Sequence, residues 1–148
     1  MPNVNLPSGA NLYFETHGQG EPLVLIPSTG FSAEAWKPSQ LPLADSTNLI
    51  LHDPRGCGRS VAAQQVYSIN QMANDIVALL DYLKIPSAHL CGHSMGGRIA
   101  LELALNFPKT CEKFDHGRQR LGTGAAARAG LRAGTAALAG DPHGRKRF

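Results

Sequence analysis

A chain of 148 residues, 43% of them hydrophobic, can form one domain with a modest core. It has no run of about 18 apolar residues and no basic or apolar leader, so we expect neither a membrane span nor a secretory signal. The net charge of +3 is uneven: residues 1–110 carry six Lys/Arg and eight Asp/Glu (−2), and residues 111–148 carry eight and three (+5).

The first third of the chain predicts strands. Turn residues between short β-forming segments predict a hairpin over residues 4–16. Residues 23–26 and 48–52 are continuous apolar runs, and this lack of alternation is typical of strands covered on both faces in a parallel sheet. Between them, Ser32 is expected to cap a short helix.

A glycine-rich loop follows the second buried strand, with the sequence Asp53-Pro54-Arg55-Gly56-Cys57-Gly58-Arg59-Ser60. We expect Asp53 and Arg55 to hold this loop by local hydrogen bonds. The alternative is an anion site in which Arg55 and Arg59 stand beside glycine N–H groups, although such loops normally lead directly into a helix. A capping-box pattern at Ser68 then predicts a helix that extends to residue 83.

The most informative stretch joins an apolar segment, residues 88–91, to a helical pattern, residues 98–107, through Gly92-His93-Ser94-Met95-Gly96. This pattern predicts a strand, a sharp turn and a helix, with Ser94 at the apex. Small residues are required at both flanking positions because the strand and helix backbones approach closely there. The free N–H groups at the start of the helix can stabilise a developing oxyanion.

The alternation of strands and helices predicts an α/β fold with a mostly parallel sheet. Ligands of such sheets bind at the carboxyl ends of the strands. Three loops are expected at these ends, namely residues 27–31, residues 53–60 and the turn at Ser94. Their convergence is the best argument for a site.

These motifs resemble the α/β-hydrolase family. Gly-His-Ser-Met-Gly-Gly is a frequent form of the family's nucleophile elbow, and residues 53–60 match its D-x-R-G-x-G-x-S loop. The resemblance covers roughly residues 3–109 and implies a truncated α/β-hydrolase fold, containing the N-terminal strands and helices. A serine rather than an aspartate at position 94 argues against the epoxide-hydrolase and haloalkane-dehalogenase branches.

The resemblance also implies roles for three residues. Ser94 would be the nucleophile, and the backbone N–H groups of Met95 and Thr29 would be the oxyanion donors. Pro27 and Ser28 stand where the family usually has a His-Gly pair. The implied substrate is a small acyl compound such as an ester, lactone or amide, and neither a cofactor nor a metal is expected.

In this family the acid and histidine of the triad follow later strands, which this chain is expected to lack. His93 is predicted to point into the sheet or its packing helices and to be structural, and no other histidine has an evident route to Ser94. A serine without a base is a weak nucleophile, so the chain is predicted to be weakly active or inactive. Residues 88–91 would become an exposed sheet edge.

Residues 110–148 are rich in Gly, Ala and Arg, without apolar periodicity, and predict a disordered tail beyond a partial domain of residues 1–109. A frameshift is one hypothesis for this tail. Back-translated with chosen codons and read one base on, residues 110–121 give Pro-Val-Lys-Ser-Leu-Ile-Met-Ala-Ala-Ser-Gly-Ser, an apolar strand and a turn. The parent DNA sequence decides this point.

The sequence leaves two other functions open. A non-catalytic interaction module could pair with a partner, or with a second copy of the chain, through the exposed sheet edge. A basic arm could bind nucleic acid, but aromatic residues for base stacking are scarce, so neither a nucleic-acid nor a membrane partner is expected. The cysteines, Cys57, Cys91 and Cys111, lack metal-ligand spacing and fit reduced thiols in the cytoplasm.

Overall fold

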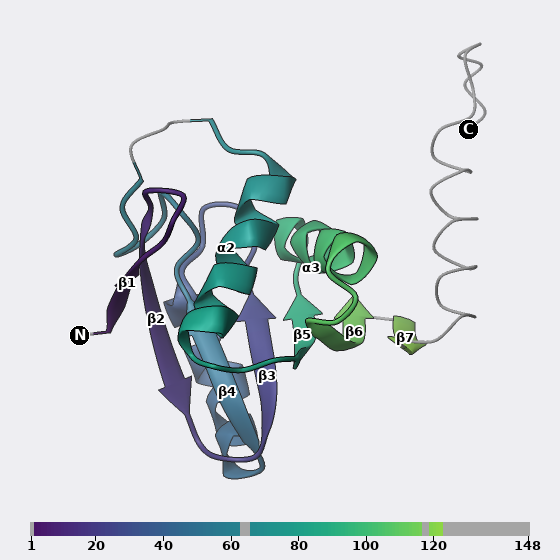
Figure 1. The fold of residues 1–148 in the computed structure, drawn as a ribbon. Helices are drawn as coiled ribbons and strands as arrows, with labels where there is room; N and C mark the ends of the chain where they lie inside the picture. The colour runs from purple at the N-terminus through teal and green to yellow at the C-terminus, as the bar shows by residue number, and fades with distance from the viewer. Residues whose placement is uncertain (1, 63–65, 117–118, 123–148) are drawn as a thin grey trace, which may run out of the picture.

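The computed structural model describes residues 2–62, 66–116 and 119–122. These residues form one sheet with the strand order β1-β2-β4-β3-β5-β6-β7 (Figure 1). The strands are β1 (Asn3–Asn5), β2 (Asn11–His17), β3 (Glu21–Ile26), β4 (Thr47–His52), β5 (Ala88–Gly92), β6 (Cys111–His116) and β7 (Gln119–Gly122). The helices are η1 (Ala33–Ala35), α1 (Lys37–Gln40), η2 (Leu41–Asp45), α2 (Ile69–Tyr82) and α3 (Met95–Asn106).

The centre of the sheet is parallel, as the apolar runs predict. Strands β4, β3, β5 and β6 run in the same direction, and each forms a parallel pair with its neighbour. The flanks are antiparallel: β1 and β2 form the expected hairpin, β2 pairs with β4, and β7 pairs with β6. The α/β fold class is therefore confirmed, with a mixed sheet.

The expectation that β5 lies at an edge is wrong. Strand β6 pairs with it in parallel, with an irregularity in register between Ala88 and Leu90. The Ala88 N–H also donates to the Thr110 carbonyl, at 3.0 Å. Backbone pairing needs no periodic side-chain pattern, which is why the sequence of this segment did not predict a strand. Residues 117–118 and 123–148 of the predicted tail lie outside the described residues, and the boundary at residue 109 stays a prediction.

Helices α2 and α3 lie on one face of the sheet (Figure 1). The capping box of α2 is present: the Ser68 Oγ accepts the Gln71 N–H, and the Gln71 side chain accepts the Ser68 N–H. Apolar residues of both helices pack with alternate residues of the strands, including Val24, Ile50 and Leu90. This first face forms the main core. No helix among the described residues is long and apolar enough to cross a membrane.

The second face is covered by the short elements η1, α1 and η2. Its core is small and consists of Leu25, Leu49 and Leu51 with Ala33, joined by partly buried side chains such as Trp36. Ser32 stands at the N-cap position of η1, but its side chain makes no capping hydrogen bond, contrary to expectation. The Asp53 carboxylate accepts the N–H of Ala33 instead, at 2.8 Å.

Candidate active site

Three loops meet at the carboxyl ends of adjacent parallel strands, as the sequence predicts. Residues 27–32 follow β3, residues 53–60 follow β4, and the turn at Ser94 follows β5. Strand β3 lies between the other two, so its loop has the turn on one side and the glycine-rich loop on the other. The loops therefore come together at one end of the sheet because of the strand order alone.

The turn between β5 and α3 holds Ser94 in an unusual backbone conformation. Its φ is 54° and its ψ is −114°, and its side chain is exposed. A positive φ is uncommon for a residue other than glycine and marks local strain. The strain is maintained by hydrogen bonds on both sides: the His93 N–H donates to the Ile26 carbonyl, at 3.1 Å, and the Gly97 N–H donates to the Ser94 carbonyl, at 3.0 Å.

The flanking glycines are required by close backbone approaches. A Cβ atom at Gly92 would lie 2.3 Å from the Gly96 carbonyl oxygen, and one at Gly96 would lie 2.0 Å from the Ile26 carbonyl oxygen. Real Cβ atoms are essentially never found so close to backbone. The steric reason for small residues at positions 92 and 96 is thus visible in the structure, and the start of α3 packs directly on the end of β3.

Thr29 lies next to the first residue of α3. Its Oγ1 donates to the Met95 sulfur at a distance of 3.4 Å. The N–H of Met95 is at the first helical position, where no carbonyl of the same helix can accept it. The structure therefore brings together the two residues that the resemblance names as oxyanion donors, beside the Ser94 turn.

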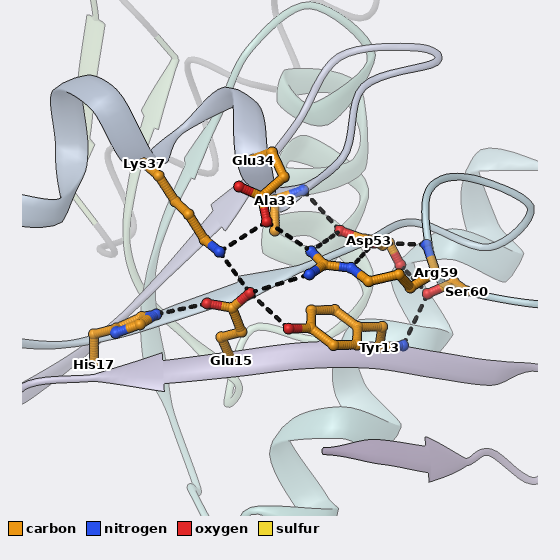
Figure 2. Close-up of polar contacts among 9 residues, drawn as sticks. All are labelled: Tyr13, Glu15, His17, Ala33, Glu34, Lys37, Asp53, Arg59 and Ser60. Carbon is orange, nitrogen blue, oxygen red and sulfur yellow. Dashed lines mark hydrogen bonds and ion pairs between the residues drawn. The ribbon is translucent and has the colours of Figure 1, made fainter. Parts of the chain in front are cut away.

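Asp53 holds the glycine-rich loop, as predicted, through its contacts with Arg59. One carboxylate oxygen, Oδ2, accepts the Arg59 N–H at 2.8 Å and the Arg59 Nε–H at 3.0 Å (Figure 2). Arg59 also forms ion pairs with Glu34 and Glu15, at 3.2 and 3.6 Å. The sequence reasoning missed this network. The sequence signal nearest to this network is the glycine at position 58. A side chain there would collide with the Asp53 carboxylate, because a Cβ at Gly58 would lie 2.3 Å from Asp53 Oδ2.

Arg55 has a different partner from the one expected. It does not bond within its own loop but reaches Asp75 on α2, with its Nε donating to Oδ2 at 2.6 Å. Both side chains are almost fully buried, with 3% and 4% exposed. The hydrogen bonds that Arg55 donates to the Asp75 carboxylate raise the pKa of Arg55, and they outweigh the opposing effect of burial. Since both arginines of this loop have carboxylate partners, the structure does not favour the anion-site alternative.

The histidines give Ser94 no base within the described residues. No hydrogen bond to the Ser94 hydroxyl is found in this part of the chain. His17 contacts Glu15, and His89 contacts Glu21, at the opposite end of β3. The side chain of His116 and all of His143 lie outside what the structure describes.

His93 is exposed, which corrects the expectation that its ring packs into the sheet or its helices. The described core of the second face gathers around Leu25, Leu49 and Leu51 on β3 and β4, and His93 is not part of it. Because burial depends on such distant elements, the sequence next to His93 could not predict it.

His52, at the end of β4, is a buried packing residue, as expected. It is 3% exposed, and its Nδ1 has no hydrogen-bond partner among the described residues. Burial lowers its pKa to about 4. Within the described residues no three His, Cys, Asp or Glu side chains are grouped closely enough to hold a metal ion.

Comparison with known families agrees with this geometry. Residues 21–114 match the model of the alpha/beta hydrolase fold family. The chain belongs to the α/β-hydrolase family. The match includes β3, the three loops, β5 and α3, so Thr29, Ser94 and Met95 all lie inside it.

Two curated α/β-hydrolase relatives illustrate the similarity. The Azorhizobium caulinodans protein named "Putative carbamate hydrolase RutD" is 41% identical over 100 residues, which are 68% of this chain and 38% of that protein. The 3-oxoadipate enol-lactonase 2 of Acinetobacter baylyi is 37% identical over 100 residues, or 66% of this chain and 38% of that protein. The chain thus spans about two fifths of the length of these relatives.

Solved α/β-hydrolase structures show the same arrangement. A hydrolase from Pseudomonas aeruginosa PA01 superposes with a TM-score of 0.75 and 28% identity, over 90% of this chain and 51% of that one. The enol-lactonase from Burkholderia xenovorans LB400 has a TM-score of 0.73 and 31% identity, over 76% of this chain and 45% of that one. The chain therefore spans about half the length of these two solved chains.

Proposed function

We propose that this chain carries the nucleophile side of a serine hydrolase site. Ser94 would attack the substrate, and the N–H groups of Met95 and Thr29 would bind the oxyanion that forms. The observation that supports this most is the strained conformation of Ser94, at a turn whose flanking glycines allow strand and helix to approach. This is the arrangement that a nucleophile elbow needs.

The substrate class is proposed from chemistry that the relatives share. Their names include a putative carbamate hydrolase, an enol-lactonase and an enzyme that degrades N-acyl homoserine lactone. Carbamates and lactones each have a carbonyl carbon that a serine can attack to form a tetrahedral oxyanion. We therefore propose a small-molecule acyl compound with an ester, lactone, carbamate or amide bond as the substrate.

We further propose that the chain by itself reacts slowly. A serine hydroxyl needs a neighbouring base at neutral pH, and the described residues supply none to Ser94. Oxyanion donors alone leave a residual rate far below that of a complete triad.

A fluorophosphonate probe tests the proposal, with covalent labelling followed by intact mass. We expect slow labelling of the unchanged chain, no labelling of Ser94→Ala, and unchanged labelling of the control Ser39→Ala, at an exposed position of α1. Labelling that persists in Ser94→Ala would exclude Ser94 as the nucleophile. Rapid labelling that is lost in Ser94→Ala would instead show that the chain has a working base.

Pairing through a free β5 edge is not favoured as an alternative function, because β6 occupies that edge. The outermost described strands are β1 and β7. A monomer in sedimentation velocity at high concentration would argue against self-association through either of them. The cytoplasm remains our proposed location, on the basis of cysteines that the structure shows without disulfides.

A further inference from the structure

The loop of residues 27–32, which contains Thr29, is held at both ends. At its start, the Ile26 carbonyl accepts the His93 N–H at 3.1 Å, which links β3 to the Ser94 turn. At its end, the Ala33 N–H donates to Asp53 Oδ1 at 2.8 Å. The second attachment is made by a side chain 20 residues away, on the neighbouring strand's loop.

Within the loop, few contacts restrict the backbone. The Phe31 N–H donates to the Ser28 carbonyl at 3.1 Å and closes a turn, and Gly30 has a positive φ of 74° with open space around it. The side chain of Ser32, which could have capped η1, makes no such bond. The position of Thr29 therefore depends strongly on the two attachments at the ends of the loop.

The Asp53 carboxylate is itself rigidly placed. It is fully buried, and its second oxygen accepts both the backbone N–H and the side-chain Nε–H of Arg59 (Figure 2). Its backbone is fixed by Ser60, whose Oγ donates to the Asp53 carbonyl at 2.6 Å and accepts the Tyr13 N–H at 2.8 Å. Gly58 leaves the space that the carboxylate occupies, since a Cβ at this position would lie 2.3 Å from Asp53 Oδ2.

Arg59 also contacts β2, through the side chains of Tyr13 and Glu15. Its guanidinium lies over the Tyr13 ring, 3.5 Å from the ring centroid. Lys37 bridges Glu15 on β2 and Glu34 on η1, at 2.8 Å to each, so the same network ties η1 to the sheet (Figure 2). Residues from β2, η1, α1 and the loop after β4 thus share one connected set of charged contacts.

Asp53 is charged in this setting. Burial alone would raise its pKa, but hydrogen bonds from the Arg59 side chain and backbone and from the Ala33 backbone outweigh burial and lower the pKa. A charged acceptor makes a stronger hydrogen bond with a backbone N–H than a neutral one. The bond to Ala33 is therefore a firm attachment for the end of the loop.

We propose that Asp53 is a positioning residue for the oxyanion site: by accepting the Ala33 N–H, its carboxylate keeps Thr29 beside Met95 and the Ser94 turn. Asp53 does not touch the substrate in this account, and acts through the loop. The inference rests on the proposed function for its catalytic meaning, because the oxyanion role of Thr29 belongs to that proposal. The placement of Thr29 beside Met95 can be measured independently of any reaction.

The test uses nuclear magnetic resonance on the full chain. In Asp53→Ala we expect amide exchange at Ala33 to rise about tenfold or more, and the contact between the Thr29 and Met95 side chains to disappear. Asp53→Asn keeps an oxygen that can accept the Ala33 N–H, so it should restore part of the contact. Asp45→Ala, at an exposed position of η2, is the matched control and should change neither measurement.

Phenylboronic acid gives the second measurement, since its boron accepts an electron pair from the serine oxygen and becomes a tetrahedral anion, while the hydroxyl proton passes to the buffer. We expect an adduct at Ser94 that perturbs the Met95 and Thr29 amides, with affinity about tenfold lower in Asp53→Ala. A merely structural role would lower the unfolding temperature and leave this affinity unchanged. If Asp53→Ala fails to fold, Arg59→Gln removes a side-chain donor to the carboxylate and should change both measurements in the same direction.

The outcomes separate the two proposals. An unchanged Thr29–Met95 contact in Asp53→Ala would overturn the positioning role, whatever the boronate does. Fluorophosphonate labelling that persists in Ser94→Ala, with the contact still lost in Asp53→Ala, would refute the proposed nucleophile but support the placement of the loop by Asp53.

Discussion

The two faces of the sheet are held together by different interactions. On the first face, α2 and α3 bury a large apolar cluster against alternate strand residues, among them Val24, Ile50 and Leu90. The polar exception is the buried Arg55–Asp75 pair. Stability on this face comes mainly from removing apolar surface from water, which depends little on pH or salt.

On the second face, four buried apolar residues form the core, and the covering elements are short. Glu15 and Tyr13 point to this face because they alternate along β2 with Leu12 and Phe14 of the main core. There they join Lys37 and Arg59 in the charged network. This face therefore depends on ionisation, and the Ser94 turn lies where the two faces meet, with α3 from one and the Thr29 loop beside the other.

The largest expected change in stability comes from Gly96, where the start of α3 packs on the end of β3. Gly96→Ala would place a Cβ 2.0 Å from the Ile26 carbonyl oxygen, and backbone must move to accommodate it. We expect a loss of about 5 kcal/mol in the free energy of unfolding, measured by urea denaturation. The control is Gly9→Ala, because Gly9 has a positive φ of 78° but open space around it. It should lose about 1 kcal/mol, and equal losses at both glycines would contradict the steric argument.

The next effect tests the polar exception on the first face. Asp75→Asn leaves the buried Arg55 charge without its partner and should cost about 3 kcal/mol of unfolding free energy. Asp81→Asn, exposed on the same helix, should change stability by less than about 0.5 kcal/mol. Replacing both partners with apolar residues, Arg55→Met with Asp75→Leu, should recover much of the loss. Failure to recover would show that the pair is needed for more than charge compensation.

The pH dependence of stability tests the second face. Burial opposes ionisation of Glu15, but hydrogen bonds from Lys37, Tyr13 and His17 outweigh it and lower the pKa from 4.5 to about 2. The stabilisation is complete above the unfolded pKa of 4.5 and is lost as the pH falls toward 2. Glu15→Gln should lower the free energy of unfolding by on the order of 2 kcal/mol at pH 7. It should also flatten the acid limb, which is the fall in stability between pH 4.5 and 2. An acid limb unchanged by Glu15→Gln, or flattened as much by the exposed control Asp45→Asn, would argue against this origin.

The smallest expected effect concerns His52. Burial lowers its pKa from 6.5 to about 4, so the unfolded chain binds this proton first as the pH falls. Its contribution is complete above pH 6.5 and is lost between pH 6.5 and 4. His52→Leu removes this dependence and the unpaired Nδ1, and should raise stability by about 1 kcal/mol at pH 5. Calorimetry at pH 5 and 7 measures it, with His93→Gln at an exposed ring as the control. A loss of stability at both pH values would contradict the prediction.

The sequence predicted local geometry well and distant contacts poorly. Gly92 shows the predicted clash between elements adjacent in the chain, and the capping box of α2 was predicted from side chains three residues apart. The close approach at Gly96 is instead to Ile26 on β3, which the local sequence did not predict. The partner of Arg55 could not be predicted in this way, because Asp75 lies a loop and a helical turn away. The cap of η1 could not be predicted for the same reason. Asp53, from the loop after a neighbouring strand, accepts the Ala33 N–H in place of Ser32.

Strand β6 was missed for another reason. Its pairing with β5 uses backbone groups, and the tail sequence has no apolar periodicity to predict it. The roles of Ser94, Met95 and Thr29 stay predictions, carried by family resemblance and supported by their proximity. The general lesson is that the residues of the turn specify its shape, whereas the surrounding strands specify what lies beside it.

The pairing of Ile26 with Gly92 gives the register of β3 a direct influence on the position of Ser94. The carbonyl that receives the His93 N–H is the same one that packs against Gly96. A slip of β3 by one residue would turn its other side chains toward α3. The same slip would break the hydrogen bond from the His93 N–H to the Ile26 carbonyl. Any redesign of the loops at this end of the sheet should therefore keep Ile26 paired with Gly92.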